Sequence, residues 1–357
     1  MDAGGATTTH EVVKDYYGKV LKSSEDLKTS ACCTADAAPG FLRPLFAAVP
    51  GEIMSRYYGC GFPVPAGLSG CSVLDLGCGT GRDVYLAAQL VGSEGRVVGV
   101  DMTDEQLEVA RRYRDSFAEA QGMRPEQVDF VKGYIEDLAT AGLGDASFDV
   151  AISNCVVNLS ADKRAVLSEI HRVLKEGGEF YFSDVFVDRR LPADVACHDV
   201  LYGECLGGAL YKDDFVFMAR DVGFRDARAV TAREIEIHDP EIRKLIGSAR
   251  FYSVTYRLFK IGSLDYQCED YGQSVTYQGG VEGSENLFWF DDHHCFEKGR
   301  SERVCGNTFD MLKARFGGFF SFTGDRSVHF GKYPDCDTMA TMTYRPTASD
   351  GGAASCC

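Results

Sequence analysis

Between Cys71 and Phe186, short β-rich runs alternate with helical patterns, and this alternation restricts the fold more than any other feature of the sequence. One intervening helix is expected to begin at a capping box, Thr103 to Gln106, and another to end at Gly177. Strands and helices in alternation predict an α/β domain with a doubly wound, mostly parallel sheet. The predicted strands are Val73 to Leu76, Val97 to Val100, Val128 to Lys132, Phe148 to Ser153 and Glu179 to Asp184.

The first predicted strand runs directly into a glycine-rich turn that contains Gly77, Gly79 and Gly81. Glycines allow a ligand to approach the backbone closely. An acidic residue, Asp101, closes the next strand at 101 − 81 = 20 residues past the last glycine. A carboxylate at that spacing is typical of one that binds ribose hydroxyls, so a nucleotide-containing cofactor is expected.

Asp75 favours one class of cofactor over another. A carboxylate just before the first glycine would repel a pyrophosphate, but it suits the ammonium group of a methionine moiety. The expected cofactor is therefore S-adenosylmethionine rather than a dinucleotide.

A further acidic site follows the third predicted strand, at Glu136. There it could accept a hydrogen bond from the adenine amino group, with Ile135 and Met102 as apolar neighbours of the ring. The alternative is that Glu136 and Asp137 only cap the start of a helix.

The chain contains 14 cysteines, although its start lacks the basic residues and apolar run of a secretory signal. Without such a signal, thiol or metal chemistry explains cysteines better than a disulfide framework does. No two cysteines have C-x-x-C spacing, so the sequence predicts no zinc knuckle or finger.

The formal net charge of -16 opposes binding to phosphate backbones and to anionic membrane surfaces. The sequence also contains no uninterrupted apolar stretch long enough to span a bilayer. We therefore expect no nucleic acid partner, no membrane partner and a cytoplasmic location.

The changing pattern along the chain predicts a modular organisation. Residues 1–70 form a preface with a flexible substrate loop, and residues 71–190 the cofactor-binding domain. A small α+β unit is expected over 191–262, where two short strands follow an amphipathic helix that ends at Gly223. A β-containing C-terminal domain follows over 263–346, and 347–357 form a disordered tail.

Taken together, these motifs resemble the arsenite S-adenosylmethionine methyltransferases, and the resemblance covers most of the chain. The resemblance implies a class I methyltransferase fold in which the 191–262 unit binds arsenic. The motifs that carry it are Tyr16-Tyr17-Gly18, Arg56-Tyr57-Tyr58-Gly59-Cys60, Asp75 to Arg82, Gly133-Tyr134-Ile135-Glu136, Ser153 to Leu159, Tyr181 to Val185, and Gly203 to Leu210.

The resemblance assigns the chemistry to four cysteines. It implies that Cys60, Cys155 and Cys205 hold trivalent arsenic, and that Cys32 pairs with Cys60 during redox turnover. Cys33 follows Cys32 directly, so either sulfur could fill that role. Thiolates suit arsenic, which is a soft acceptor and keeps a lone pair when three sulfurs hold it.

Several expectations follow from the same resemblance. Tyr58 and Asn154 are predicted to contact S-adenosylmethionine. The substrate would be arsenite or its thiol conjugates, and a thiol reductant of the glutathione or thioredoxin type would restore the enzyme.

Two alternatives stay open at this point. The first is a methyltransferase for an ordinary carbon, nitrogen or oxygen acceptor, in which the cysteines are incidental. The second is a thiol-rich, arsenic-binding protein without catalytic activity.

Overall fold

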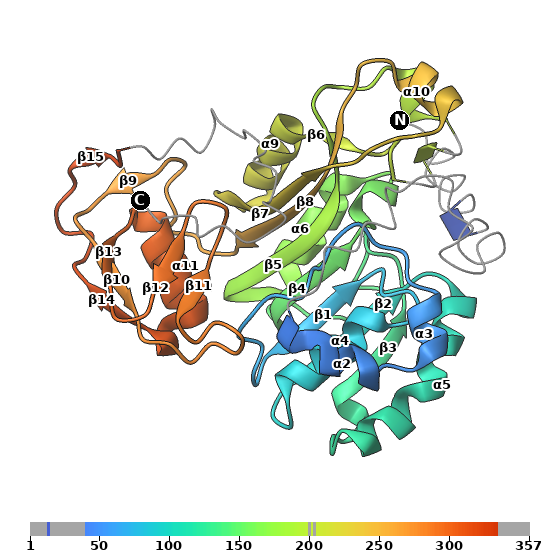
Figure 1. The fold of residues 1–357 in the computed structure, drawn as a ribbon, viewed down its shortest axis with the longest axis horizontal. Helices are drawn as coiled ribbons and strands as arrows, with labels where there is room; N and C mark the ends of the chain where they lie inside the picture. The colour runs from blue at the N-terminus through green and yellow to red at the C-terminus, as the bar shows by residue number, and fades with distance from the viewer. Residues whose placement is uncertain (1–12, 15–39, 199–200, 203–204, 335–357) are drawn as a thin grey trace.

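The computed structural model describes residues 13–14, 40–198, 201–202 and 205–334. Its centre is an eight-stranded sheet with the order β3-β2-β1-β4-β5-β8-β7, in which β6 pairs with β5 (Figure 1). Strands β1 to β5 are mutually parallel, whereas β8 runs antiparallel to both β5 and β7. The sheet is formed by β1 (Ser72–Leu76), β2 (Arg96–Asp101), β3 (Val128–Lys132), β4 (Phe148–Asn154), β5 (Leu174–Val187), β6 (Leu210–Tyr211), β7 (Ala227–Glu234) and β8 (Phe251–Phe259).

Helices cover both faces of the sheet because its strands alternate their side chains between two apolar clusters. Val73 packs with α4 and α5 on one face, and the next residue, Leu74, packs with α6 and α9 on the other. This alternation is the physical basis of the doubly wound arrangement. The helices are α2 (Arg43–Ala48), α3 (Gly51–Ser55), α4 (Arg82–Val91), α5 (Asp104–Ala120), α6 (Lys163–Val173), α7 (Ala193–Ala196), α9 (Lys212–Val222), α10 (Pro240–Ile246) and α11 (Gly306–Phe316).

The predicted fold class is confirmed, and each of the five predicted strands is present. Two local predictions need correction. The Thr103 side chain makes no cap hydrogen bond, so the predicted capping box is wrong, although α5 does begin at Asp104. Helix α6 ends at Val173, before the predicted Gly177, because Leu174 already starts the extended strand β5.

The two strands expected within the separate 191–262 unit are β7 and β8, and they extend the main sheet. Strand β8 pairs with β5 over Glu179 to Val187, and β7 pairs with β8. Helix α9 packs on the same sheet through Phe215 and Ala219. The described residues of this part therefore share the core of the cofactor-binding domain and form no sheet separate from it.

The C-terminal part lies beside the sheet and has a separate apolar core around helix α11 (Figure 1). Its small sheets pair β10 with β13 and β14, β11 with β12, and β9 with β15. The bounds are β9 (Glu269–Asp270), β10 (Ser274–Tyr277), β11 (Leu287–Trp289), β12 (Cys295–Glu297), β13 (Ser301–Arg303), β14 (Phe320–Thr323) and β15 (Gly331–Lys332).

Within the described ranges, no helix is long and apolar enough to cross a membrane.

Candidate active site

The glycine-rich turn after β1 forms part of the lining of a pocket at the carboxyl ends of the parallel strands. Gly77 adopts a φ of 67°, and a Cβ there would lie 2.4 Å from Cγ1 of Val156. The turn and the loop after β4 therefore approach each other more closely than any other residue would allow. This is the edge at which open α/β sheets bind ligands.

Two buried carboxylates, Asp75 and Asp101, line this pocket. Burial and the neighbouring Asp83 raise the pKa of Asp75 well above its usual range. Burial also raises the pKa of Asp101, although the backbone N–H groups of Thr103 and Gly79 oppose the shift by donating to this carboxylate. A cationic ligand would relieve the repulsion among these acids, which suits the ammonium and sulfonium groups of S-adenosylmethionine.

Apolar side chains also line the pocket. Met102 and Ile135 line it together with Glu136, whose carboxylate accepts a hydrogen bond from the Ser160 hydroxyl. No helix begins at Glu136, since the described residues between β3 and β4 form turns, and Asp137 caps one of them by accepting from Thr140. The helix-capping alternative for this motif is therefore wrong.

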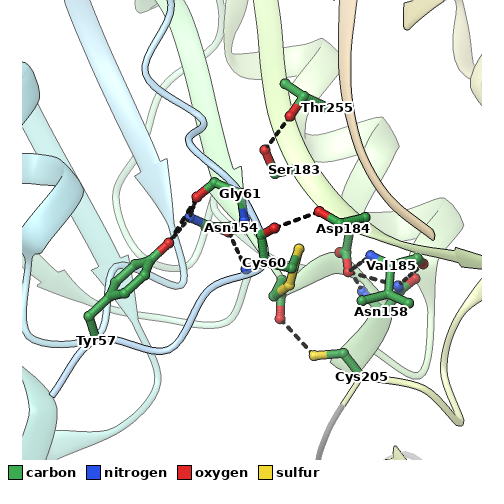
Figure 2. The surroundings of a disulfide bond; sticks show 12 residues. Tyr57, Cys60, Gly61, Asn154, Asn158, Ser183, Asp184, Val185, Cys205 and Thr255 are labelled. Carbon is green, nitrogen blue, oxygen red and sulfur yellow. Dashed lines mark hydrogen bonds between the residues drawn. A yellow bond between two sulfur atoms is a disulfide. The ribbon is translucent and has the colours of Figure 1, made fainter. Parts of the chain in front are cut away.

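Tyr58 and Asn154 also line the pocket. The Asn154 amide connects β4 to the segment around Cys60. Its Oδ1 accepts from the Cys60 N–H at 3.1 Å, and its Nδ2 donates to the Gly61 carbonyl at 3.0 Å and to the Tyr57 hydroxyl (Figure 2). Asn154 thus holds the Cys60 segment against the pocket, besides lining the pocket itself.

The three cysteines predicted to bind arsenic meet beside this pocket. Cys60 and Cys155 form a disulfide, and the Cys205 thiol donates to the Cys155 carbonyl at 3.1 Å (Figure 2). All three are buried, and Cys155 also lines the cofactor pocket. The pairing of Cys60 with Cys155 was not predicted. Cys32, with its predicted pairing to Cys60, lies outside the described residues, as do Cys33, Cys356 and Cys357.

The backbone at two of these cysteines is unusual. Cys155 has a φ of 56° and Cys205 a φ of 63°, in the left-handed region that residues other than glycine rarely adopt. Such conformations cost roughly 1–3 kcal/mol each and gather at functional sites, where the surrounding structure imposes them. The fold therefore holds both sulfur-bearing residues in unfavourable conformations at one place.

Asp184 is a buried residue of the site whose importance the sequence did not indicate. Its carboxylate oxygens accept from the N–H and Nδ2 of Asn158, at 3.1 and 2.7 Å, and from the Val185 N–H at 2.8 Å. Burial raises its pKa to about 7. Through its bonds to Asn158, Asp184 anchors the loop that follows Cys155. One of its oxygens also lies within 4.8 Å of the sulfurs of Cys60 and Cys155.

Asp83 and Arg82 are further residues of the pocket that the sequence analysis did not assign. Asp83 pairs with Arg82 at 2.6 Å, and the Arg82 guanidinium lies 3.1 Å from the centre of the Tyr57 ring. All three stand inside or next to the motifs quoted above, but nothing in the sequence separates them from their neighbours.

Comparison with known proteins agrees with this geometry. A family model described as a methyltransferase domain matches residues 68–223, and one described as an arsenite methyltransferase C-terminal domain matches residues 271–346. An arsenite methyltransferase from Aquipseudomonas alcaligenes is 54% identical over 349 residues, covering 98% of this chain and 100% of that protein. One from Mus musculus is 45% identical, covering 89% and 84%.

A solved structure gives the same result. The arsenic(III) S-adenosylmethionine methyltransferase from Chlamydomonas reinhardtii matches with a TM-score of 0.81 and 51% identity, covering 83% of this chain and 100% of that one. The fold and the pocket define a class I S-adenosylmethionine-dependent methyltransferase. Within that class, the chain belongs to the arsenite methyltransferase family, which confirms the resemblance drawn from the motifs.

Proposed function

We propose that this chain methylates trivalent arsenic that is held by the sulfurs of Cys60, Cys155 and Cys205. The single observation that carries the proposal is the meeting of these three residues at the wall of the cofactor pocket, with Cys155 common to both. Family membership supports the same reaction and argues against an ordinary carbon, nitrogen or oxygen acceptor.

The residues of the pocket divide the work of binding the methyl donor. Asp75 faces the ammonium group, Asp101 the ribose hydroxyls, and Glu136 with Met102 and Ile135 the adenine. Gly77 and Gly79 allow the close approach, and Tyr58 and Asn154 close the side next to the sulfurs. S-adenosylmethionine supplies an electrophilic methyl group, so the protein has to align the arsenic lone pair and exclude water.

Arsenic capture needs free thiols. Arsenite, As(OH)3, exchanges its three oxygens for three sulfurs, and each thiol proton leaves with a hydroxide as water. Since Cys60 and Cys155 are bonded to each other in the structure, a thiol reductant has to open this disulfide first.

Methylation takes arsenic from the trivalent to the pentavalent state. Two thiols that close to one disulfide return two electrons and restore trivalent arsenic, and the disulfide is then reduced by glutathione or a thioredoxin-type protein. Cys32 with Cys60 is the pair that the resemblance implies for this step.

The proposal is tested by incubating the protein with arsenite, S-adenosylmethionine and a thiol reductant, and separating the methylated products by chromatography. Cys155→Ser and Cys205→Ser should lose about 99% of the rate, because a hydroxyl is a poor ligand for a soft centre, but should still bind S-adenosylmethionine. Cys71→Ser is the matched control, since Cys71 lies just before β1, at the other end of that strand from the pocket. Full turnover by the Cys155 or Cys205 variant would refute the proposed role of the sulfurs.

A further inference from the structure

Helix α11 of the C-terminal part reaches back to the segment that carries Cys60. Arg315 on this helix donates from Nη1 to the Gly67 carbonyl at 2.8 Å and from Nη2 to the Ala66 carbonyl at 3.4 Å. Ala66 also packs against the apolar core of the C-terminal part. The chain that leaves Cys60 is therefore fixed to another part of the molecule within seven residues.

The guanidinium of Arg315 is itself held in place. Its Nε lies 3.3 Å from the carboxylate of Glu179 in β5, and the Arg315 side chain is only 7% exposed. The other oxygen of Glu179 pairs with Arg257 of β8 at 3.0 Å, and Arg257 donates to the Phe290 carbonyl at 2.6 Å. The buried carboxylate of Glu179 thus joins the main sheet to the C-terminal part, next to the point where Arg315 binds the Ala66 and Gly67 carbonyls.

The contact at Gly67 leaves little room for a side chain or for movement of the backbone. Gly67 has a φ of 72°, and a Cβ there would lie 3.1 Å from the Phe316 ring. The segment between the two anchored ends contains Pro63 and Pro65, which restrict their own backbone and that of the preceding residues. A displacement at Ala66 and Gly67 is therefore transmitted along a stiff chain rather than absorbed.

At its Cys60 end, the same segment is fixed next to the other cysteines of the site. The Ser253 hydroxyl of β8 donates to the Cys60 carbonyl at 2.5 Å, and Asn154 bonds both Cys60 and Gly61. A Cβ on Gly61 would lie 2.5 Å from the Ser183 Oγ, so this backbone is pressed against the sheet. The position of Cys60 thus depends on anchors in both parts of the molecule.

We propose that the C-terminal part positions the third sulfur of the arsenic site, with Arg315 as the positioning residue that fixes the segment from Cys60 to Gly67. The inference rests on the proposed role of Cys60. It gives the C-terminal part a task in the reaction, namely to hold one ligand in register with Cys155 and Cys205, without touching the substrate.

The test compares two arsenicals that need different numbers of sulfurs. Arsenite has three replaceable oxygens, whereas phenylarsonous acid has two and can be held by Cys155 and Cys205 alone. In the reduced full-length protein, Arg315→Gln and Gly67→Ala should each weaken arsenite binding by about tenfold, because a displaced third ligand loses its effective concentration. Phenylarsonous acid and S-adenosylmethionine should bind as they do to the unaltered chain.

Three controls make the result specific. Arg326→Gln removes ion pairs of similar geometry, to Asp265 and Asp310 at 2.8 Å, that stay within the C-terminal part, and it should leave both arsenicals unaffected. Arg315→Lys keeps the positive charge beside Glu179 but loses the several N–H donors of the guanidinium. It should bind arsenite more tightly than Arg315→Gln does, but less tightly than the unaltered chain. Alkylation of Cys60, followed by peptide mass spectrometry, should be faster in Arg315→Gln, with Cys205 unchanged.

Unchanged arsenite affinity in both Arg315→Gln and Gly67→Ala would overturn the inference, as would an equal loss in Arg326→Gln or an equal loss for both arsenicals. Cys60→Ser separates the two levels of the argument. If it binds arsenite as tightly as the unaltered chain, the proposed role of Cys60 fails. If Cys60→Ser binds arsenite weakly, and the Arg315 and Gly67 variants bind it as tightly as the unaltered chain, only the positioning role fails.

Discussion

Cys155 is the residue at which the cofactor pocket and the sulfur cluster meet. It lines the pocket, its sulfur bonds that of Cys60, and its carbonyl accepts from the Cys205 thiol. Its left-handed backbone follows directly on the last residue of β4, Asn154, which holds the Cys60 segment in place. A methyl acceptor held here lies beside the donor because one residue belongs to both sites.

Asp75 makes binding of the methyl donor depend on pH. Burial and the neighbouring Asp83 raise its pKa, so between the usual carboxyl value and this raised value the side chain carries a proton. A cationic ligand needs the ionised form, so the affinity for S-adenosylmethionine should rise with pH through the raised pKa, with proton release on binding.

Calorimetry in buffers of different ionisation enthalpy measures this proton release. Asp75→Asn should weaken binding by roughly 10- to 150-fold and remove most of the pH dependence, because the loss of a hydrogen bond to a charged group costs roughly 1.5–3 kcal/mol. Asp149→Asn, which alters a half-buried pair with Lys175 at the other end of β4 from the pocket, serves as the control. An unchanged pH profile in Asp75→Asn would assign the dependence to another group.

The residues that sequence could predict are those marked by a pattern. Each of the nine predicted cofactor contacts lines one pocket. Seven were predicted from local features such as the glycine turn and the strand-end carboxylates, and Tyr58 and Asn154 from the family resemblance. Asp83, Asp184 and the bond between Cys60 and Cys155 escaped prediction. Their importance comes from contacts across 26 to 95 positions of sequence, for which no spacing rule exists.

At the scale of elements, the turn between β1 and α4 should be the part most sensitive to added volume. Gly77→Ala combines a left-handed backbone with a clash against Val156, and we expect a loss of roughly 2–4 kcal/mol of stability, with weaker binding of S-adenosylmethionine. Gly122→Ala is matched, since Gly122 ends helix α5 with a φ of 66° and has nothing within 4 Å of its Cβ position. It should lose only about 1 kcal/mol and keep its affinity.

Urea unfolding and calorimetry measure the two effects. Equal losses in both alanine variants would show that backbone strain alone matters, and that the close approach of the glycine turn to the β4 loop does not.

Individual helices and strands were easier to predict than the pairing of strands within the sheet. The amphipathic helix ending at Gly223 and the strands of the first half follow from local periodicity, and they appear as α9 and β1 to β5. The membership of β7 and β8 in the main sheet did not follow, because the partner of a strand is decided by packing between distant segments. Strand β8 pairs with β5 across about seventy residues of intervening chain.

For the whole molecule, the carboxylate of Glu179 is one of the buried links between the sheet and the C-terminal part, beside the Arg228–Asp291 pair. It is fully buried and faces both Arg257 and Arg315. Glu179→Gln would leave two guanidinium groups without their counter-charge, and we expect a loss of about 3–5 kcal/mol in the free energy of unfolding. Asp145→Asn, which breaks an exposed pair with Arg172, should cost less than about 1 kcal/mol. Equal midpoints of urea unfolding for the two variants would contradict this.

The central claim is that three sulfurs from separate segments hold arsenic beside the methyl donor. Arsenic X-ray absorption on the reduced protein loaded with arsenite counts those sulfurs directly. The account predicts three sulfur neighbours in the unaltered chain and two in each of Cys60→Ser, Cys155→Ser and Cys205→Ser. An arsenic atom that keeps three sulfurs in any of these variants, or is bound only by oxygen in the unaltered chain, would contradict it.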